Sequence, residues 1–474
     1  MVRTALTATL ALATLSPLWA QASLAWNQPT RGVAVAVDAQ RNVFTVDFDY
    51  NPAGDIALTK RDTDGNLLWT TGFNQTDNTL WEKAAWLDCD SQGRAVVCGT
   101  LMSGYSNPVN AASILMKFDT DGTLLWRQVF DSSFDGSSTR KCLVDAQDNI
   151  YVLGLGMGNA GLTTRVRKFA PDGVVVWTWQ DSQGIGAPQN LKFTPDGGLL
   201  VMARGTVGST NGFAKVNGDG TLAWSLTGII SIPSCDAAGD AQGGTYLVHG
   251  ENAFNGGMVL RKLDAAGATQ WSTVHAIGGT RVQVGSDNLP LICGSPNYNG
   301  TGAAFLKCTT SGAPLWSNMN ADGALNLLTQ SMFILDGQNN GYLAAASFGA
   351  GMEMAVCRVN ADGSSGWTFT MPSGGAVALD RDSANAIYLV GGHTAKIQQG
   401  PPALPAPVVD YVWGPACNSR LEWNAVPGAL DYQVWGASML GQSWQELGVT
   451  GQLNWSLPCE AGGMGIFRVV ARGN

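Results

Sequence analysis

The sequence predicts an all-β fold made of a repeated unit, and three observations lead to this prediction. Glycine accounts for 60 of the 474 residues, whereas Asp, Glu, Lys and Arg together account for 13%, against about 25% in a typical globular domain. Short β-branched runs separated by Gly and Asn recur along the chain. A glycine followed four residues later by a tryptophan recurs seven times between residues 65 and 367.

The length of the repeat selects the architecture. Successive tryptophans of the pattern are 45 to 57 residues apart, and they are Trp69, Trp126, Trp177, Trp224, Trp271, Trp316 and Trp367. A period of this length, filled with short strands and almost no helical pattern, is typical of one four-stranded blade of a β-propeller. We therefore expect each repeat to form one blade.

The other half of the repeat gives the number of blades. A strand that ends near Asp38 and is followed by residues 42–46 is one of eight such halves along the chain, one more than the glycine–tryptophan halves. The segment Ser23–Asn27, which contains Trp26, supplies the missing strand. The sequence thus predicts an eight-bladed propeller over residues 23–398, closed by the N-terminal strand, with seven blades as the alternative.

The Asp-Gly dipeptides lie between the third and fourth strands of a blade, where glycine provides the positive φ of a tight turn. The run from Asp62 to Gly65 also looks like the start of a calcium loop, but such a loop needs a distal glutamate, and a strand follows here instead. We predict a turn and no metal site. We expect the tryptophans to pack between blades, and the short turns to share one face of the ring.

Two bacterial families show similar repeats. Residues 117–126 and 144–154 resemble the extracellular propeller repeat called SBBP, and the glycine-to-tryptophan spacing resembles the docking motif of quinoprotein dehydrogenases and of the PQQ-like scaffold of outer-membrane assembly. The quinoprotein resemblance implies two adjacent cysteines and a calcium site containing glutamate. The propeller has no adjacent cysteines and only Glu82, Glu251 and Glu353, so we predict no cofactor.

Residues 1–22 have the pattern of a signal peptide, with Arg3 at the start, an apolar run over residues 5–15 and the small-x-small sequence Ala20-Gln21-Ala22. No later run has the length and hydrophobicity of a membrane span. A net charge of −9 disfavours DNA and RNA as partners. We predict an exported monomer, either secreted or held in the periplasm or at the cell surface.

The C-terminal part changes character after a proline-rich linker at residues 399–408. Residues 409–474 resemble a bacterial fibronectin type III module, through residues 420–429 and 467–471, and the resemblance places Trp423 and Trp435 in a core. The nine cysteines are an odd number. Cys417 and Cys459 are the predicted disulfide, and two further pairs, Cys89 with Cys98 and Cys293 with Cys308, are close enough in the expected strands to be candidates.

No nucleophile motif occurs, and we predict no catalytic residue. Binding residues are expected on the longer loops, which a rigid scaffold can present to a ligand. The candidates are Asp47, Trp81, Tyr105, His249, Glu251 and Tyr298. The sequence favours a binding or scaffold protein of the bacterial envelope, with a glycan or an envelope protein as partner. An extracellular enzyme acting on polysaccharide or peptide is the alternative, and a scaffold that captures another protein's strand is a third.

Overall fold

The computed structural model describes a chain made entirely of strands and their connections. The described residues are 22–48, 56–73, 81–102, 109–135, 139–158, 161–204, 210–230, 235–250, 257–296, 301–326, 332–348, 352–372, 374–400, 407, 409–412, 420–426, 429–437, 445–456 and 466–472. They form 38 β-strands and no helix. Two compact units result, one of which is Ala22–Gln398 and the other of which contains Gln399–Asn474.

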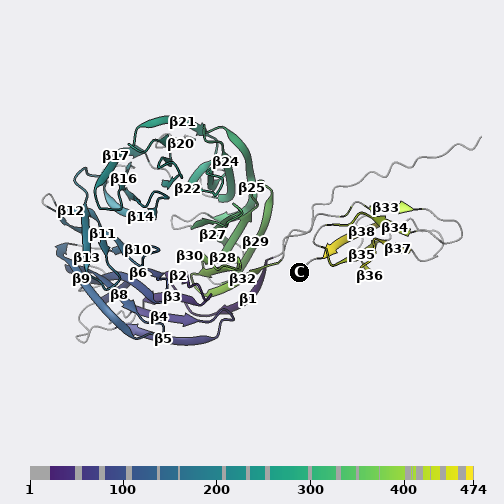
Figure 1. Cartoon of the computed structure of the whole chain (residues 1–474), viewed down its shortest axis with the longest axis horizontal. Helices are drawn as coiled ribbons and strands as arrows, with labels where there is room; N and C mark the ends of the chain where they lie inside the picture. Colours follow the sequence, from purple (N-terminus) through teal and green to yellow (C-terminus); the bar gives the residue numbers. More distant parts are fainter. Residues whose placement is uncertain are drawn as a thin grey trace, which may run out of the picture. The chain divides into compact units, whose positions relative to one another are not determined.

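The first unit is a ring of eight four-stranded antiparallel blades (Figure 1). Blade 1 consists of β2 (Ala34–Val37), β3 (Val43–Phe48), β4 (Ile56–Arg61) and β5 (Leu67–Phe73), and blade 2 of β6 (Trp81–Cys89), β7 (Ala95–Met102), β8 (Val109–Phe118) and β9 (Leu124–Asp135). Blade 3 consists of β10 (Thr139–Val144), β11 (Ile150–Gly158), β12 (Gly161–Phe169) and β13 (Val175–Gln180), and blade 4 of β14 (Ala187–Phe193), β15 (Leu199–Arg204), β16 (Thr210–Val216) and β17 (Leu222–Ile230).

Blades 5 to 8 continue the ring. Blade 5 consists of β18 (Asp236–Gly239), β19 (Thr245–Gly250), β20 (Met258–Leu263) and β21 (Thr269–His275), and blade 6 of β22 (Gly278–Val284), β23 (Pro290–Ser295), β24 (Thr301–Cys308) and β25 (Pro314–Asn326). Blade 7 consists of β26 (Phe333–Leu335), β27 (Gly341–Phe348), β28 (Met352–Val359) and β29 (Ser365–Pro372), and blade 8 of β30 (Ala378–Arg381), β31 (Ile387–Val390), β32 (Thr394–Gln399) and β1 (Ala22–Gln28). Blades 6 and 7 are also joined through a short pairing of β25 with β27.

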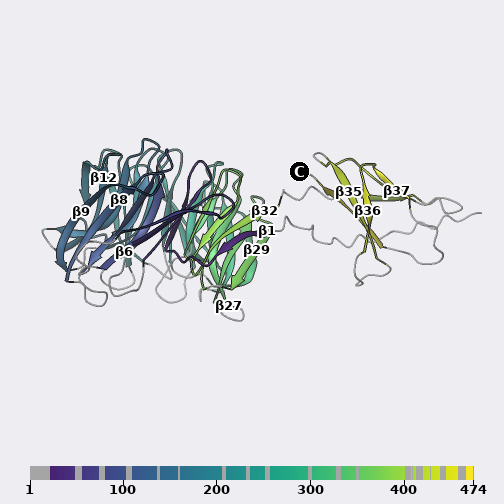
Figure 2. The ribbon, with the colours of Figure 1, turned by 90° about the horizontal axis from the view of Figure 1, so that it is seen from below.

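Burial explains the different strand sequences within a blade. Second strands such as β19 and β31 are buried at every position, because each lies inside a sheet that is covered on both faces by neighbouring blades. Fourth strands such as β21 alternate between exposed and half-buried residues. The edge-on view shows the first unit as a disc of stacked sheets (Figure 2), so its core consists of the layers between blades.

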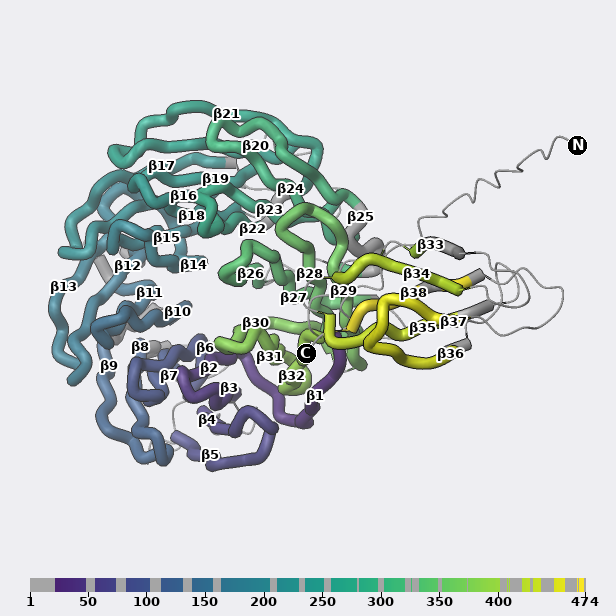
Figure 3. The backbone as a smooth tube through the Cα atoms, turned by 45° about the vertical axis from the view of Figure 1, so that its right-hand side comes forward, coloured from purple at the N-terminus to yellow at the C-terminus, as the bar shows by residue number. Residues whose placement is uncertain are grey.

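The N-terminal strand completes the last blade, as the sequence predicted. β1 pairs with β32, and the sheet order is β1-β32-β31-β30; the tube view shows β1 beside β32 (Figure 3). The indole nitrogen of Trp26 donates to the Thr63 carbonyl at 3.0 Å, across the junction with blade 1. The side chains of Asn27 and His393 are 2.9 Å apart. Eight blades, and not seven, close the ring.

Each repeated tryptophan packs on the next blade, which confirms its predicted role. At Gly122, where φ is +88°, an added Cβ would lie 3.0 Å from the Trp69 ring, and the Trp69 indole nitrogen donates to the Thr120 carbonyl at 2.8 Å. The same contact joins seven glycines to the tryptophan of the preceding blade: Gly65, Gly122, Gly173, Gly220, Gly267, Gly312 and Gly363. Glycine is required here because its lack of a Cβ leaves room for the indole.

A lysine in the third strand of most blades links two turns. Lys117 has its ammonium nitrogen 2.9 Å from an Asp90 carboxylate oxygen, in the turn between the first and second strands of its own blade. It also donates to the Pro171 carbonyl, in the third-to-fourth-strand turn of the next blade, at 3.3 Å. Both kinds of short turn therefore share one face of the ring, as expected. Equivalent lysine–aspartate pairs involve Lys60, Lys168, Lys215, Lys262 and Lys307.

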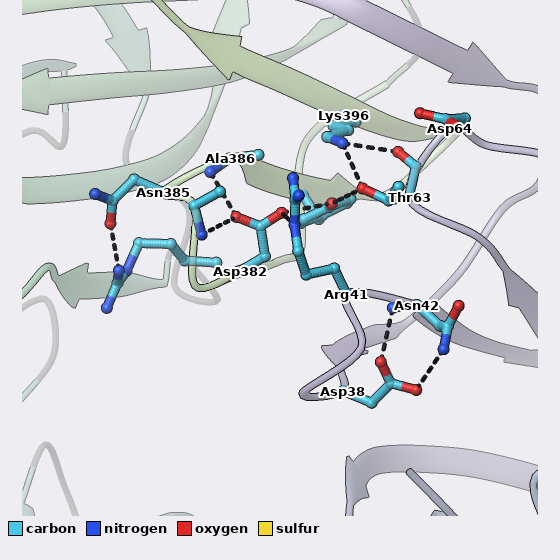
Figure 4. Close-up of polar contacts among 12 residues, drawn as sticks. Asp38, Arg41, Asn42, Thr63, Asp64, Asp382, Asn385, Ala386 and Lys396 are labelled. Atoms are coloured by element: carbon cyan, nitrogen blue, oxygen red, sulfur yellow. Dashed lines mark hydrogen bonds and ion pairs between the residues drawn. The ribbon is translucent and has the colours of Figure 1, made fainter. Parts of the chain in front are cut away.

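Polar contacts reinforce the junction where the ring closes (Figure 4). The Arg41 guanidinium donates to an Asp382 carboxylate oxygen at 2.8 Å, and so joins the first turns of blades 1 and 8. The Lys396 ammonium donates to the Thr63 carbonyl at 2.7 Å and to its hydroxyl at 2.8 Å. Residues more than 300 positions apart in the chain are held together by these bonds.

The second unit contains a small β-sandwich. One sheet has the order β33 (Val409–Val412), β34 (Arg420–Trp423), β37 (Asn454–Ser456), and the other has the order β36 (Gln445–Thr450), β35 (Asp431–Ala437), β38 (Ile466–Arg472). Trp423 and Val434 lie in its core. Trp423 is thus a core residue, as predicted, whereas Trp435 is half-buried.

The disulfides considered within the propeller do not form. Cys89 and Cys98 are free thiols, because the register of β6 and β7 places Ala95 opposite Cys89 and Trp86 opposite Cys98. Cys308 is also a free thiol, and Phe305 is the residue opposite Cys293. These two pairings were wrong. Cys417 and Cys459 lie outside the described residues, so their pairing stays a prediction.

Candidate functional site

The first strands of the eight blades surround the axis of the ring (Figure 3). The residues two and four positions before the turn that ends each first strand differ between blades. In blades 1 and 7 they are apolar, namely Ala34, Ala36, Met332 and Ile334, and in blade 8 they are Ala378 and Asp380. In blades 2 to 6 most are polar, and we call the following residues the axial cluster: Asp88, Lys141, Asn190, Lys192, Asp236, Arg281 and Gln283. One side of the axis is therefore polar and charged.

Lys141 joins three blades at the axis. Its ammonium group donates to the Asn190 side-chain oxygen at 2.9 Å, from β10 in blade 3 to β14 in blade 4. The same nitrogen lies 4.8 Å from the centre of the Trp86 ring on β6 in blade 2, within the range of a cation–π interaction. The Lys141 side chain is thus positioned by groups on both sides.

A second set of contacts continues the network through blades 4, 5 and 6. The Lys192 ammonium donates to an Asp236 carboxylate oxygen at 2.5 Å and to the Val282 carbonyl at 3.0 Å. The Val282 amide donates to the same Asp236 oxygen, Oδ2, at 3.0 Å. Gln283 then donates to the Phe333 carbonyl in blade 7. Hydrogen bonds on the inner strands therefore run from blade 3 to blade 7.

Asp236 has one oxygen left over from this network. The residue is 1% exposed, and its Oδ1 atom is buried with no hydrogen-bond partner in the structure. A buried acceptor without a donor costs about 1–3 kcal/mol. The Asp236 Oδ1 atom is therefore a position that a hydroxyl group or a water molecule would stabilise.

The charges of the axial cluster act on one another. Burial lowers the pKa of Lys141 to about 8, with a further decrease from the positive charge of Lys192, while Asp88 and Asp236 oppose the decrease. Arg281, three blades away, also acts on Lys141. These five groups comprise three cations and two carboxylates, a formal sum of +1. The Asp380 carboxyl at the equivalent position of blade 8 interacts electrostatically with Asp88 and lowers this sum to 0 when it is ionised.

Two carboxyl groups of the first strands hold neighbouring blades together. Asp88 accepts hydrogen bonds from the amides of Cys89 and Val144, and Asp380 accepts them from Arg381 and Val37. In each case the second donor belongs to the first strand of the next blade. These strands are inner edges, whose amide groups have no further strand to pair with.

Burial affects the protonation of both carboxyls. It raises the pKa of Asp88 to about 6 and that of Asp380 to about 7, where the charge of Asp88 adds to the increase. Desolvation disfavours the charged form of a carboxyl. The oxygens of both carboxyl groups already accept backbone hydrogen bonds. We therefore interpret Asp88 and Asp380 as contacts that join neighbouring blades.

The residues predicted from the sequence are distributed over different blades. Asp47 lies on β3 in blade 1, Trp81 begins β6 in blade 2, and His249 lies on β19 in blade 5. His249 is 6% exposed, its Nδ1 atom is 2.8 Å from the Gly250 carbonyl oxygen, and burial lowers its pKa. The side chain of Trp81 lies outside the described residues, as do Tyr105, Glu251 and Tyr298. A ligand role for these six stays a prediction.

Sequence reasoning missed the axial cluster, although a signal was present. Charged residues replace alanine or other apolar residues at equivalent repeat positions, as Lys141 and Arg281 replace Ala34. The ring places these positions around one axis. A comparison of first strands by position would have found the cluster.

Other kinds of site are not seen in the described part of the chain. No three or more His, Cys, Asp or Glu side chains there are grouped as a metal site would require. No helical segment among those residues has the length and hydrophobicity needed to cross a bilayer. The arrangement at the axis is suited to binding, since it combines fixed positive groups with fixed hydrogen-bond acceptors.

The comparisons with known proteins support the fold. No protein-family model matches the chain, and no curated protein matches its sequence. The structure is similar to a solved structure entitled "Structure of Dos1 propeller", with 10% identity and a TM-score of 0.50 over 81% of this chain and 94% of that one. At this identity the likeness shows the fold alone. The chain is a β-propeller.

Two further solved structures show weaker similarity. A protein of unknown function from Bacteroides caccae has 11% identity and a TM-score of 0.39, and covers 70% of this chain and 93% of its own. A gluconolactonase from Xanthomonas campestris has 18% identity and a TM-score of 0.29, over 59% of this chain and 86% of its own. Neither score is high enough to transfer a property to this chain.

Proposed function

We propose that this protein is an exported, non-enzymatic β-propeller that binds a ligand at or outside the bacterial cell envelope. The observation that carries the proposal is the axial cluster. Its charged side chains are fixed by groups from neighbouring blades, as Lys141 is by Asn190 and Lys192 is by Asp236. Groups that are fixed before binding lose little entropy when a ligand arrives.

The electrostatics of the axis also favour binding over acid–base chemistry. A catalytic carboxyl must reach a reacting group, or reach it through one water molecule. Asp88 and Asp380 have raised pKa values, but each accepts backbone hydrogen bonds with both of its oxygens. Their contacts therefore support a role in joining blades.

Two features of the sequence support a location outside the cytoplasm. Residues 1–22 have the pattern of a signal peptide, and the repeats resemble the extracellular SBBP type. The second unit supports a fibronectin type III-like module, because its first, second and fifth strands share one sheet and its third, fourth and sixth share the other. Immunoglobulin-type sandwiches divide their strands in a similar way. We propose that this unit is a spacer or adhesion module.

A binding screen tests the proposed function. The full chain is expressed with its leader in a bacterial host, collected from the periplasm and medium, and applied to a glycan array and to membrane and wall fractions. Retention on a defined glycan or envelope protein, with the bound molecule recovered unchanged, is the expected result. Accumulation of the uncleaved chain in the cytoplasm would contradict the proposed location.

An extracellular enzyme is the second candidate, and Lys141 is the observation that favours it. A lysine with a pKa of about 8 is a better base at neutral pH than an ordinary lysine. Products are therefore measured in the same wells as retention. Turnover that is lost in Lys141→Met and kept in the exposed control Lys83→Met would overturn the non-enzymatic proposal.

A further inference from the structure

We propose that the axial cluster binds a small hydroxylated monocarboxylate, such as an acidic sugar, with Lys141 and Lys192 donating to its carboxylate and Asp236 accepting a hydrogen bond from one of its hydroxyl groups. This inference deepens the proposed function by naming the class of ligand, and it rests on that function being one of binding. Three features of the cluster lead to it.

The first feature is accessible positive charge. The Lys192 side chain keeps 16% of its surface exposed although its ammonium contacts Asp236, and Lys141 is also partly exposed. An ammonium group has three donor hydrogens. Lys141 uses one donor, to Asn190, and Lys192 uses two, to Asp236 and the Val282 carbonyl. A solute that reaches the axis therefore meets donors on two neighbouring positions of the ring.

The second feature is the size of the charge. The charged groups that act on Lys141, taken with Lys141 itself, sum to +1, and the Asp380 carboxyl, which interacts electrostatically with Asp88, lowers this sum to 0 when it is ionised. A monocarboxylate therefore adds at most one negative charge to a nearly neutral site, whereas a phosphate dianion would leave a strongly negative site beside Asp88 and Asp236. Like charges at short range in a partly desolvated site are costly. The cluster therefore favours a monoanion over a dianion.

The third feature is the unpartnered oxygen of Asp236. The Asp236 Oδ1 atom is buried without a donor, and its partner oxygen is already fixed by Lys192 and the Val282 amide. A simple anion has no hydrogen to donate to it. A ligand that carries a hydroxyl group near its carboxylate satisfies the Asp236 oxygen and the lysines together. The same pairing rejects a neutral sugar, which lacks the carboxylate.

Four probes test the inference on the unmodified protein by isothermal titration calorimetry. They are D-galacturonate, D-galactose, cyclohexanecarboxylate and inorganic phosphate. Galactose lacks the carboxylate, and cyclohexanecarboxylate lacks the hydroxyl groups. Since a charge-assisted hydrogen bond contributes about 10- to 100-fold in affinity, we expect galacturonate to bind at least about 10-fold more tightly than each of the others. Equal affinity for galacturonate and galactose, or tighter binding of phosphate, would overturn it.

A matched pair of variants locates the site. Lys141→Met keeps the length of the side chain and removes its charge, and we expect it to weaken galacturonate binding by about 10-fold or more. Lys83→Met removes an exposed lysine from β6 and should leave binding unchanged. Equal binding by the two variants would show that the axis is not the site. Circular dichroism checks that both are folded, and the four-probe comparison needs no variant.

The results also separate this inference from the proposed function. If the protein is retained on a glycan array but none of the soluble probes binds, the axial inference fails and the binding function stands. If galacturonate binds at the axis and is converted to another compound, the ligand class stands and the non-enzymatic proposal fails.

Discussion

Replacing Trp26 by alanine tests how the ring is closed. Trp26 lies on β1, where its indole nitrogen donates to the Thr63 carbonyl, its ring covers Gly65, and it lies 6.0 Å from the ring of Tyr388. The substitution removes these contacts from the strand that completes blade 8 but leaves the strand itself in place. We expect it to weaken the closure of the ring.

The magnitude follows from the burial of the side chain. A tryptophan buries about 150–250 Å², and Trp26 is half-buried, so about 100 Å² of contact is lost, or about 2.5 kcal/mol at 25 cal/mol per Å². The lost hydrogen bond adds about 1 kcal/mol. For a unit of roughly 380 residues, with an unfolding entropy of about 2.1 cal/mol/K per residue, a total loss of about 3.5 kcal/mol lowers the melting temperature by about 4 °C.

Differential scanning calorimetry and hydrogen exchange measure the effect. The control on the same strand is Leu24→Ala, because Leu24 is 43% exposed and its loss should change the melting temperature by less than about 1 °C. In Trp26→Ala, amides of β1 and β32 should exchange faster than in the parent. The same packing is lost in Trp126→Ala, where β1 should stay protected. A Trp26→Ala protein that melts with the parent, with β1 still protected, would refute closure by this strand.

Three further predictions concern the turns, the axis and the thiols. In urea titrations, Gly122→Ala should destabilise the propeller more than Gly197→Ala. Both alanines would adopt a positive φ, which costs about 1–2 kcal/mol. Only at residue 122 does the new Cβ also meet a tryptophan ring, 3.0 Å away, whereas residue 197 has open space. The pKa of Asp380 rises from about 3.9 in the unfolded chain to about 7 in the fold, so the native state binds the extra proton. The free energy of unfolding should therefore fall between pH 4 and 7 by up to about 1.4 kcal/mol per pH unit. Asp380→Asn should flatten this slope in urea midpoints taken at pH 5 and 8, and an unchanged slope would contradict the assignment. Cys142 is fully buried and its thiol pKa is raised well above the ordinary value by burial, so it should be labelled by a thiol reagent only after unfolding, as peptide mass spectrometry would show; labelling of the native protein would exclude such burial.

The architecture could be predicted because its determinants repeat. The ring of a tryptophan must lie on the glycine of the next turn, as Trp69 lies on Gly122, so both residues recur once per blade and can be counted. The count of first halves then required a strand from the N-terminus, and Trp26 met that requirement. Sterically determined positions of this kind are visible in a sequence without any structure.

The axial cluster does not show up as a repeat, because its members differ from blade to blade, and it emerges only when the first strands are aligned by position. Asp88 and Arg281 are almost 200 residues apart, and only the curvature of the ring brings their blades to a common axis. The pairings proposed for Cys89 and Cys98 failed for a related reason: neighbouring strands were predicted correctly, but the register that decides which residues face each other was not. Register depends on turn geometry that composition does not reveal.

Closure by β1 also sets an order of events during synthesis. The Asn27 side chain meets His393, a residue 366 positions later, so the strand made first waits for its partner until almost the whole propeller has been translated. At about 5–20 residues per second this wait is roughly 20 to 70 s. Throughout it, β1 has no partner strand and the face of blade 1 that blade 8 will cover stays available to any other chain. The newly made propeller is therefore most exposed to mispairing just before its last blade emerges.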